Sequence, residues 1–357
     1  MKTTHACTAL LWALAVAAPA WAQAPGPMNA ITDVPGVEVG QFTGTDNVSS
    51  TGGSTGTTVV LVRSGATPGV TQRGGAPGTR ETDALKPEKS LEKVHAVVLS
   101  GGSAYGLAAA DGVMQCLGSQ GIGKSVAPGQ IVPLVPAAIL FDPGRCAPFN
   151  YRPDASFGLR ACQAANGGPI QMGNVGAGAG ARSGGVKGGL GTASTVLPNG
   201  IIVGAIVAIN SSGRTFDANG NFFAGFLELG NEFDTVLPGA LPPAQAPTLL
   251  QNTTIAVVAT NATLTKAQAT KVAQMADDGL ARAIRPSHGV GDGDTIFALA
   301  TARDPRDATN LVSQIGATAA DTLSRAIVRA ILAAQSIHVG ACNVVSYCEM
   351  FPANCAH

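Results

Sequence analysis

The most reactive arrangement in the sequence is a threonine that opens an apolar segment. Thr253 follows Asn252 and begins the run Thr253–Thr260, which is apolar enough for a fully buried strand. A threonine at the start of a strand is usually structural. If the chain were cut before Thr253, however, the hydroxyl and the new α-amine would belong to one residue. An α-amine has a reference pKa of about 7.7–8.0, so it could act as the base that activates this hydroxyl.

Two aspartates on either side of Gly293 form a second candidate group. Asp292 and Asp294 lie in a glycine-rich segment a few residues after His288. Imidazole and carboxylate groups are common metal ligands, so a metal site is one interpretation. Two carboxylates and one histidine in such a segment are more often hydrogen-bonded turn residues. We therefore predict neither a metal ion nor a cofactor from these residues.

Other glycine-rich motifs fit known sites only loosely. The segment GGSAYG lacks the glycine that a nucleophile elbow has two residues after its serine, so Ser103 is predicted to cap the following helix. The segment GAGAGA (176–181) has no clear strand before it and no acidic residue about twenty positions later, unlike a dinucleotide site. Lys187 follows Val186 rather than glycine, unlike a phosphate-binding loop. We predict instead a close-packed loop that exposes backbone amides.

The composition is that of a glycine-rich α/β protein without a charge bias. The chain has 357 residues, of which 22 are basic, 22 are acidic and 46 are glycine. A zero net charge without runs of Lys or Arg argues against a nucleic-acid partner. The 45% content of hydrophobic residues excludes a disordered chain. After the N-terminal segment, no stretch reaches the about 18 apolar residues of a membrane span, so we predict no membrane anchor.

The first 22 residues have the layout of a secretory signal peptide. Lys2 precedes the apolar run ALLWALAVAA (9–18), and small residues flank Trp21 just before a cut at Gln23. We therefore predict a mature chain that begins at Gln23 in a periplasmic or secreted protein.

Cysteine usage supports export. Of the seven cysteines, one lies in the predicted signal peptide, and the even number that remains favours disulfides. Proximity in the sequence favours a bridge between Cys146 and Cys162 and one bridge within Cys342, Cys348 and Cys355. A zinc site is the alternative, but no CxxC pair is present.

Apolar segments between glycine turns predict one layered α/β core. Strands are predicted at residues 37–41, 57–62, 95–99, 201–210, 253–260 and 295–301. Helices are predicted from GGSAYG to about Leu117, after the capping box Thr265–Gln268, and over residues 312–331. The Pro-rich segment between Asn231 and Gln251 predicts an exposed loop just before the strand that Thr253 opens.

The motifs together resemble a known family of enzymes. From NAITDVPG (29–36), the resemblance continues through GGAPGTRET (74–82), LSGGSAYGL (99–107), GAGAGARSGGVKGGLG (176–191), NTTIAVVATNA (252–262) and HGVGDGDTIFALAT (288–301). These motifs are similar to those of the self-processing L-aminopeptidase/D-esterases and β-peptidyl aminopeptidases, a family that includes the nylon-oligomer (6-aminohexanoate) hydrolases. The resemblance implies a four-layer αββα sandwich like that of N-terminal-nucleophile hydrolases, with a different strand connectivity. It also implies a cut between Asn252 and Thr253, which would give an α chain (23–252) and a β chain (253–357) of one domain.

The resemblance also implies roles for individual residues. Thr253 would be the nucleophile both for self-cleavage and for attack on the substrate. Asp292 and Asp294 match the pair that positions the nucleophile and its amine. An aspartate at 292, together with the Asn-Thr-Thr junction, favours the nylon-oligomer branch of the family.

Three further positions follow from the same resemblance. Asn210 matches the asparagine that stabilises the oxyanion. Lys187 matches a lysine near the active centre of the nylon-oligomer hydrolases. Phe141 stands where several aminopeptidases have a tyrosine that lines the substrate site, so a phenol would be missing here.

The implied function is an exported, self-processing aminopeptidase or amidohydrolase. Its substrates would be small peptides or amides with a free N-terminus, including β- or D-aminoacyl and 6-aminohexanoate-type amides, and an acyl-enzyme would form on Thr253. The family implies a homo-oligomer of α/β heterodimers. Two alternatives share the fold: an acyltransferase of the ornithine-acetyltransferase type, which export disfavours, and an inactive binding protein, which the intact candidate residues disfavour.

Overall fold

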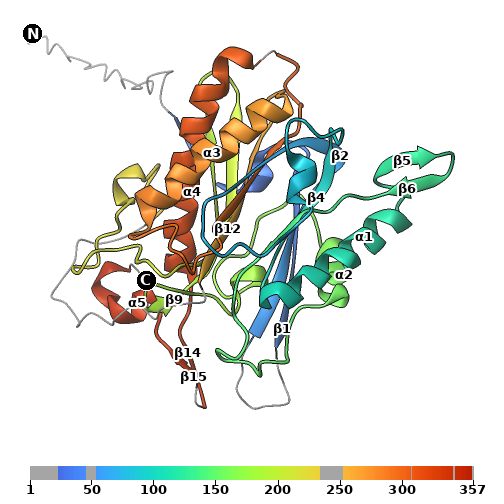
Figure 1. The fold of residues 1–357 in the computed structure, drawn as a ribbon. Coiled ribbons are helices and arrows are strands. Elements are labelled where there is room, and N and C mark those ends of the chain that lie inside the picture. Colours follow the sequence, from blue (N-terminus) through green and yellow to red (C-terminus); the bar gives the residue numbers. More distant parts are fainter. Residues whose placement is uncertain (1–22, 46–53, 234–251, 307, 341, 356–357) are drawn as a thin grey trace, which may run out of the picture.

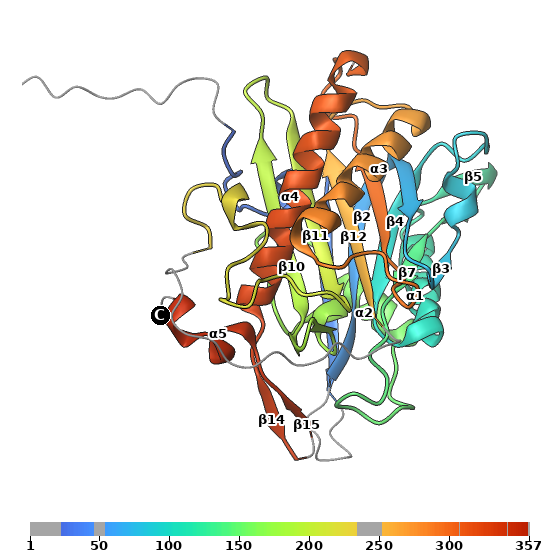
Figure 2. The same ribbon diagram turned by 60° about the vertical axis from the view of Figure 1, so that its left-hand side comes forward.

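Two β-sheets packed face to face, with helices on both outer sides, make up the fold (Figures 1 and 2). This computed structural model describes residues 23–45, 54–233, 252–306, 308–340 and 342–355. The predicted signal peptide and residues 234–251 of the Pro-rich segment lie outside this part of the chain. Within it, no helix combines the length and the apolar character that a membrane crossing needs.

The long strand β2 (Ser54–Gln72) belongs to both sheets and joins them. Its final residues pair with β13 (Thr295–Ala300) of the first sheet, which continues through β12 (Thr253–Thr260), β11 (Ile202–Asn210) and β10 (Gly189–Val196). Its first half pairs with β1 (Glu38–Thr45) and β4 (Val94–Ser100) of the second sheet, which continues through β7 (Ala137–Ile139) and β3 (Thr79–Arg80).

The sequence predicted only residues 57–62 of β2, because Gly65, Pro68 and Gly69 are residues that usually end a strand. The strand continues through them while its register against β4 shifts between Leu61 and Ala66. Gly69 is needed there, since a Cβ would lie 2.3 Å from the backbone of Ala269 in the helix above.

Alternating side chains divide the core into three apolar layers. Along β12, Ile255 and Val257 lie between the two sheets, whereas Ala256 and Val258 face the helices α3 (Lys266–Ala283) and α4 (Val312–Ala333). On the other side, apolar residues of β2 and β4 pack against α1 (Ala109–Ser119) and α2 (Ala155–Gln163). The layers are therefore helix, sheet, sheet and helix, which confirms the predicted αββα sandwich.

Of the two predicted helix starts, one is confirmed and one is wrong. The Thr265 hydroxyl accepts a hydrogen bond from Gln268 N and the Gln268 side chain accepts one from Thr265 N, so the predicted capping box is confirmed. The cap predicted at Ser103 is wrong. Ser103 adopts a left-handed φ of 54° and makes no capping bond, and a 3-10 turn (Ser103–Ala108) separates it from α1. Its amide donates instead to the carbonyl of Leu140 in the neighbouring segment.

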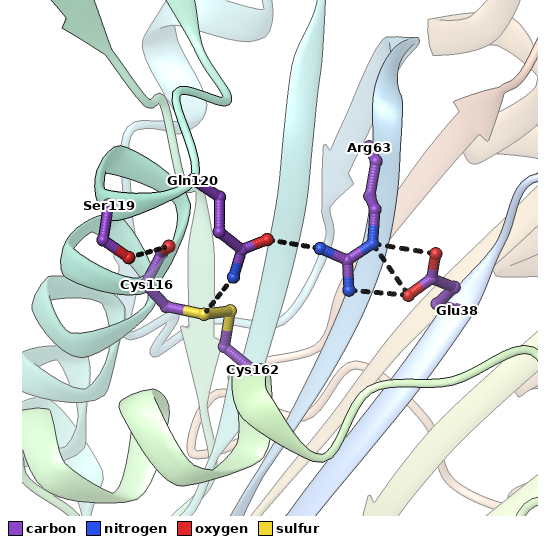
Figure 3. The surroundings of a disulfide bond; sticks show 6 residues. All are labelled: Glu38, Arg63, Cys116, Ser119, Gln120 and Cys162. Carbon is purple, nitrogen blue, oxygen red and sulfur yellow. Dashed lines mark hydrogen bonds and ion pairs between the residues drawn. A yellow bond between two sulfur atoms is a disulfide. The ribbon is translucent and has the colours of Figure 1, made fainter.

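Helices α1 and α2 cross where each carries a glycine. A Cβ on Gly112 would lie 1.7 Å from the carbonyl oxygen of Ala155, and one on Gly158 would lie 1.8 Å from that of Ala109. One helical turn after these glycines, Cys116 and Cys162 form a disulfide with a Cα–Cα distance of 6.4 Å (Figure 3). The close crossing therefore places the two thiols within bonding distance.

The other two disulfides join Cys146 to Cys342 and Cys348 to Cys355. The predicted Cys146–Cys162 bridge is wrong, because the crossing of α1 and α2 gives Cys162 a different partner. The prediction of one bridge within the C-terminal cysteines is confirmed by Cys348–Cys355.

Short elements complete the described chain. They are the hairpins β5–β6 (Lys124–Ala127 and Gln130–Val132) and β8–β9 (Arg182–Ser183 and Val186–Lys187), the ribbon β14–β15 (Ile337–Val339 and Cys342–Val344) and the helix α5 (Tyr347–Met350). The ribbon extends from the end of α4 away from the helices and sheets (Figure 2). The Tyr347 ring packs against Phe216 and Phe351, which anchors the C-terminal segment to the core.

The close crossing of α1 and α2 predicts how a substitution at Gly112 changes the free energy of unfolding. Replacing Gly112 with alanine should destabilise the protein by about 1–3 kcal/mol, because the added methyl group overlaps a backbone carbonyl that cannot move freely. Gly118→Ala on the same helix is the control, since its nearest neighbour would be the Pro133 ring at 3.9 Å. That change should be neutral or stabilising by up to about 1 kcal/mol. Thermal unfolding of both variants measures the difference, and equal midpoints would contradict the crossing.

Candidate active site

Thr253 begins β12 in the middle of the first sheet. Register pairs it with Asn210, the last residue of β11, and only 5% of its surface is exposed. Its hydroxyl contacts the carbonyl oxygen of Asn252, the residue before it. The amide of Gly293 donates to this hydroxyl at 3.1 Å and to the same carbonyl oxygen at 3.2 Å. The Asn252–Thr253 peptide bond is thus held beside a backbone N–H donor.

Gly293 is required at this position because no side chain fits. A Cβ there would lie 2.9 Å from the Thr253 hydroxyl and 2.7 Å from the carbonyl oxygen of Ala76. The segment around Ala76 packs directly on the Asp292–Asp294 loop, and Ala76 N donates to Asp292 O at 2.8 Å. Gly293 was not predicted as a donor from the sequence, although a glycine between two acidic residues is a signal for a close backbone approach.

Asp294 is bonded to the strand that Thr253 opens. One carboxylate oxygen accepts the amide of Thr254 at 2.7 Å. The other accepts the amide of His288 at 3.1 Å and lies 3.0 Å from Nδ1 of the same histidine. Asp294 is 2% exposed, so these partners replace water around a buried carboxyl group.

Asp292 is held on the other side of the loop. Its carboxylate accepts the Ser212 amide at 3.2 Å, the Ser212 hydroxyl and the Gly289 amide at 3.2 Å. Burial raises the pKa of Asp292 above its ordinary value. The carboxylates of Asp292 and Asp294 therefore have separate partners, and the described residues contain no group of His, Cys, Asp or Glu side chains arranged to hold a metal ion.

Asn210 lies beside Thr253 as the register of the strands requires. Its amide nitrogen donates to the carbonyl oxygen of Phe141 at 3.3 Å, which uses one of its two hydrogens. Its side-chain oxygen accepts the Arg182 amide at 3.0 Å and contacts the Arg145 guanidinium. Phe141 thus joins the site through its backbone, and its ring faces Arg145 at 5.7 Å.

Arg145 is a site residue that the sequence analysis missed. Besides Asn210, it donates to the side-chain oxygen of Asn252 at 3.4 Å. Burial lowers the pKa of Arg145 to about 10, which leaves it charged at neutral pH. The neighbouring Cys146 fixes this loop to the C-terminal ribbon through the bond to Cys342. Nothing local in the sequence distinguishes Arg145, because its partners lie far along the chain.

Lys187 occupies a buried position close to this group. Its Nζ donates to the carbonyl oxygens of Gly178 at 3.0 Å and Gly188 at 2.7 Å. Burial lowers the pKa of Lys187 to about 7, and the opposing charge of Asp142 limits the decrease. Asp142, also missed from sequence, accepts the Thr55 hydroxyl and the Gly102 amide at 2.7 Å each, and burial raises its pKa.

The glycine-rich loop does not expose its amides as predicted. The amide of Gly176 donates to the Thr43 hydroxyl at 2.8 Å, and that of Ala177 donates to the Thr58 hydroxyl at 3.1 Å. Both residues are buried against the second sheet. The loop therefore supports Lys187 and the sheet from within rather than offering donors to a ligand.

The comparisons with known proteins identify the family. Residues 29–344 match the peptidase family S58. The chain belongs to this family. An uncharacterized aminopeptidase of Mycobacterium leprae is 46% identical over 91% of this S58 chain and 95% of its own length. A 6-aminohexanoate-oligomer endohydrolase of Kocuria sp. is 30% identical over 75% of this chain and 74% of its own length.

Solved structures share the fold of this S58 chain. A Burkholderia sp. β-aminopeptidase superposes with a TM-score of 0.69 at 24% identity, covering 91% of this chain and 92% of that one. The L-aminopeptidase D-Ala-esterase/amidase of Ochrobactrum anthropi is described as a variant of the Ntn hydrolase fold. It superposes with a TM-score of 0.68 at 22% identity, covering 90% of this chain and 92% of that one. The predicted family is confirmed, and the chain is a hydrolase of the aminopeptidase/amidohydrolase type.

Proposed function

We propose that the protein is an exported, self-processing aminopeptidase/amidohydrolase with Thr253 as its N-terminal nucleophile. One observation carries the proposal: the Thr253 hydroxyl lies against the carbonyl of its own preceding residue, with the Gly293 amide donating to both oxygens. Attack by the hydroxyl on this carbonyl carbon would form an ester and release the Thr253 amine. Water would then hydrolyse the ester and free the β chain.

Substrate hydrolysis would reuse the same atoms. The free α-amine accepts the hydroxyl proton while Oγ bonds to the acyl carbon of the substrate. The amine then returns the proton to the leaving nitrogen as the C–N bond breaks, and water hydrolyses the acyl-enzyme. Gly293 N–H and the second amide hydrogen of Asn210 are the proposed donors to the oxyanion. Phe141 would line the part of the site that binds the acyl group, and the buried Lys187 would support the surrounding residues.

The buried acids indicate which substrates fit. Asp292 and Asp294 lie on either side of the Gly293 donor, so an ammonium group on the substrate would find a counter-charge there. This favours small peptides and amides with a free N-terminus. The similarity to a 6-aminohexanoate-oligomer hydrolase extends the proposed class to linear amides with a terminal amine.

Export and assembly are part of the proposal. Three disulfides suit a chain that folds in an oxidising compartment, in keeping with the signal peptide predicted before Gln23. The processed α/β heterodimers would assemble into a homo-oligomer.

A pair of matched substrates tests the proposed specificity. An aminoacyl p-nitroanilide should be hydrolysed with a kcat/KM about 10- to 100-fold above that of its N-acetyl analogue, the effect of one charge-assisted hydrogen bond to the free amine. The proposed chemistry uses no metal, so EDTA should leave the rate unchanged. Equal rates for both substrates would reduce the assignment to a general amidase, and inhibition by EDTA would refute the mechanism.

A further inference from the structure

A partly buried histidine links the site to helix α3. His288 lies with its Nδ1 3.0 Å from the carboxylate of Asp294 and its Nε2 3.4 Å from that of Asp277 on α3. The imidazole therefore bridges two carboxylates that come from different elements. It is also one of the non-glycine residues with a left-handed backbone, at a φ of 58°, which the packing around the loop must maintain.

Asp277 is a buried acid on α3. Its side chain is fully buried, and within the described residues neither of its oxygens makes a hydrogen bond. Burying a carboxylate in this way is unfavourable unless a cation lies close. Two groups that can carry a positive charge are near: the His288 ring, and the Arg73 guanidinium, which lies 3.3 Å from the same oxygen but is half exposed to solvent.

We propose that His288 is a positioning residue that, as a cation held between Asp277 and Asp294, keeps the Asp294 carboxylate oriented toward the start of β12. The chain of contacts runs from Asp277 through His288 and Asp294 to the amide of Thr254, next to the nucleophile. The inference rests on the function proposed above, since the start of β12 matters to the reaction only if Thr253 is the nucleophile.

The surrounding charges agree with a protonated histidine. The hydrogen bond to Asp294 and the charge of Asp277 raise the pKa of His288, while burial and Arg73 oppose the increase. Burial raises the pKa of Asp277 to about 6, so it is mostly ionised at neutral pH. Among the residues that the structure describes, Asp278, which is exposed on α3, and Asp292, on the same loop as His288, are the other charged groups in this region.

An NMR titration of the histidine rings measures this arrangement without any activity. The signal of His288 is assigned by its loss in His288→Asn, since asparagine tolerates the left-handed backbone. In the processed wild type, its pKa should lie above the ordinary value of about 6.5, and Asp277→Asn should lower it by about one pH unit. Asp278→Asn is the control and should leave it nearly unchanged. A wild-type pKa at or below about 6.5, or no response to Asp277→Asn, would overturn the proposal.

Kinetics separate positioning from a purely structural effect. The ratio of wild-type to Asp277→Asn kcat should increase up to about tenfold as the pH rises through the histidine pKa, because the variant loses its imidazolium first. His288→Asn keeps a hydrogen-bond donor but no charge, so kcat should fall about tenfold while KM changes little. A ratio that does not depend on pH would overturn the positioning role. An uncut or inactive wild type would instead refute the proposed function, and the NMR result would still report on the histidine.

Discussion

Replacing Thr253 with alanine should leave the protein as one chain, whereas the wild type should separate into residues 23–252 and 253–357. The hydroxyl in contact with the Asn252 carbonyl is the group that would attack it, and alanine removes this group without changing the backbone. Thr254→Ala is the matched control, because its hydroxyl makes no hydrogen bond within the described residues, and it should still be cut. Intact-mass measurement distinguishes the products. Cleavage of Thr253→Ala at the same bond would end the proposal.

The disulfides predict whether these two fragments stay covalently joined after cleavage. Cys146 and Cys342 lie on opposite sides of the proposed cut, whereas each of the other two bridges lies within one fragment. In denaturing electrophoresis, the cleaved wild type should therefore migrate as one species without a reducing agent and as two species with it. Cys342→Ser should give two species in both conditions. Two species from the unreduced wild type would exclude this bridge but not the cleavage.

The sequence was most informative where one local pattern determines a structure. The run from Thr253 to Thr260 consists of apolar residues and threonines, and it forms the predicted strand with the predicted bounds, buried throughout. The Thr265–Gln268 box fixed the start of α3, because its partners are three residues apart. By contrast, Ser103 looked like a helix cap but forms a turn, since Leu140 and Asp142 from a distant segment bind the backbone at Gly102 and Ser103.

The sequence predicted only part of the site, for the same physical reason. Thr253 and the Asp292–Asp294 pair stand out by residue type and by their positions at strand ends. Arg145 and Asp277 act through partners that only the packed sheets and α3 bring near them. Cys162 illustrates the same limit, because two facing glycines decide its partner and the spacing of cysteines does not.

Asp294→Asn should slow substrate turnover by about 10²–10⁴-fold while the fold is retained. Groups that position a proton transfer typically contribute this much, and the substitution changes charge but not shape. The amide oxygen of asparagine can still accept the Thr254 N–H, so β12 should keep its start. Asp278→Asn, an exposed carboxylate on α3, is the control and should retain activity. Cleaved protein of each variant is compared by kcat and thermal unfolding, and near-normal turnover of Asp294→Asn would reduce Asp294 to a turn residue.

The pH dependence of the same variants tests why the charge matters. Activity should rise with pH as the Thr253 α-amine loses its proton, near its reference pKa of about 7.7–8.0. A carboxylate nearby stabilises the ammonium form and raises this pKa, so removing the charge in Asp294→Asn should move the rise to lower pH. His288→Asn removes a positive charge from the same group and should move the rise to higher pH. If the two substitutions displace the pH–activity profile in opposite directions, both residues act electrostatically on the nucleophile. A general loss of structure would lower the rate without moving the profile in two directions.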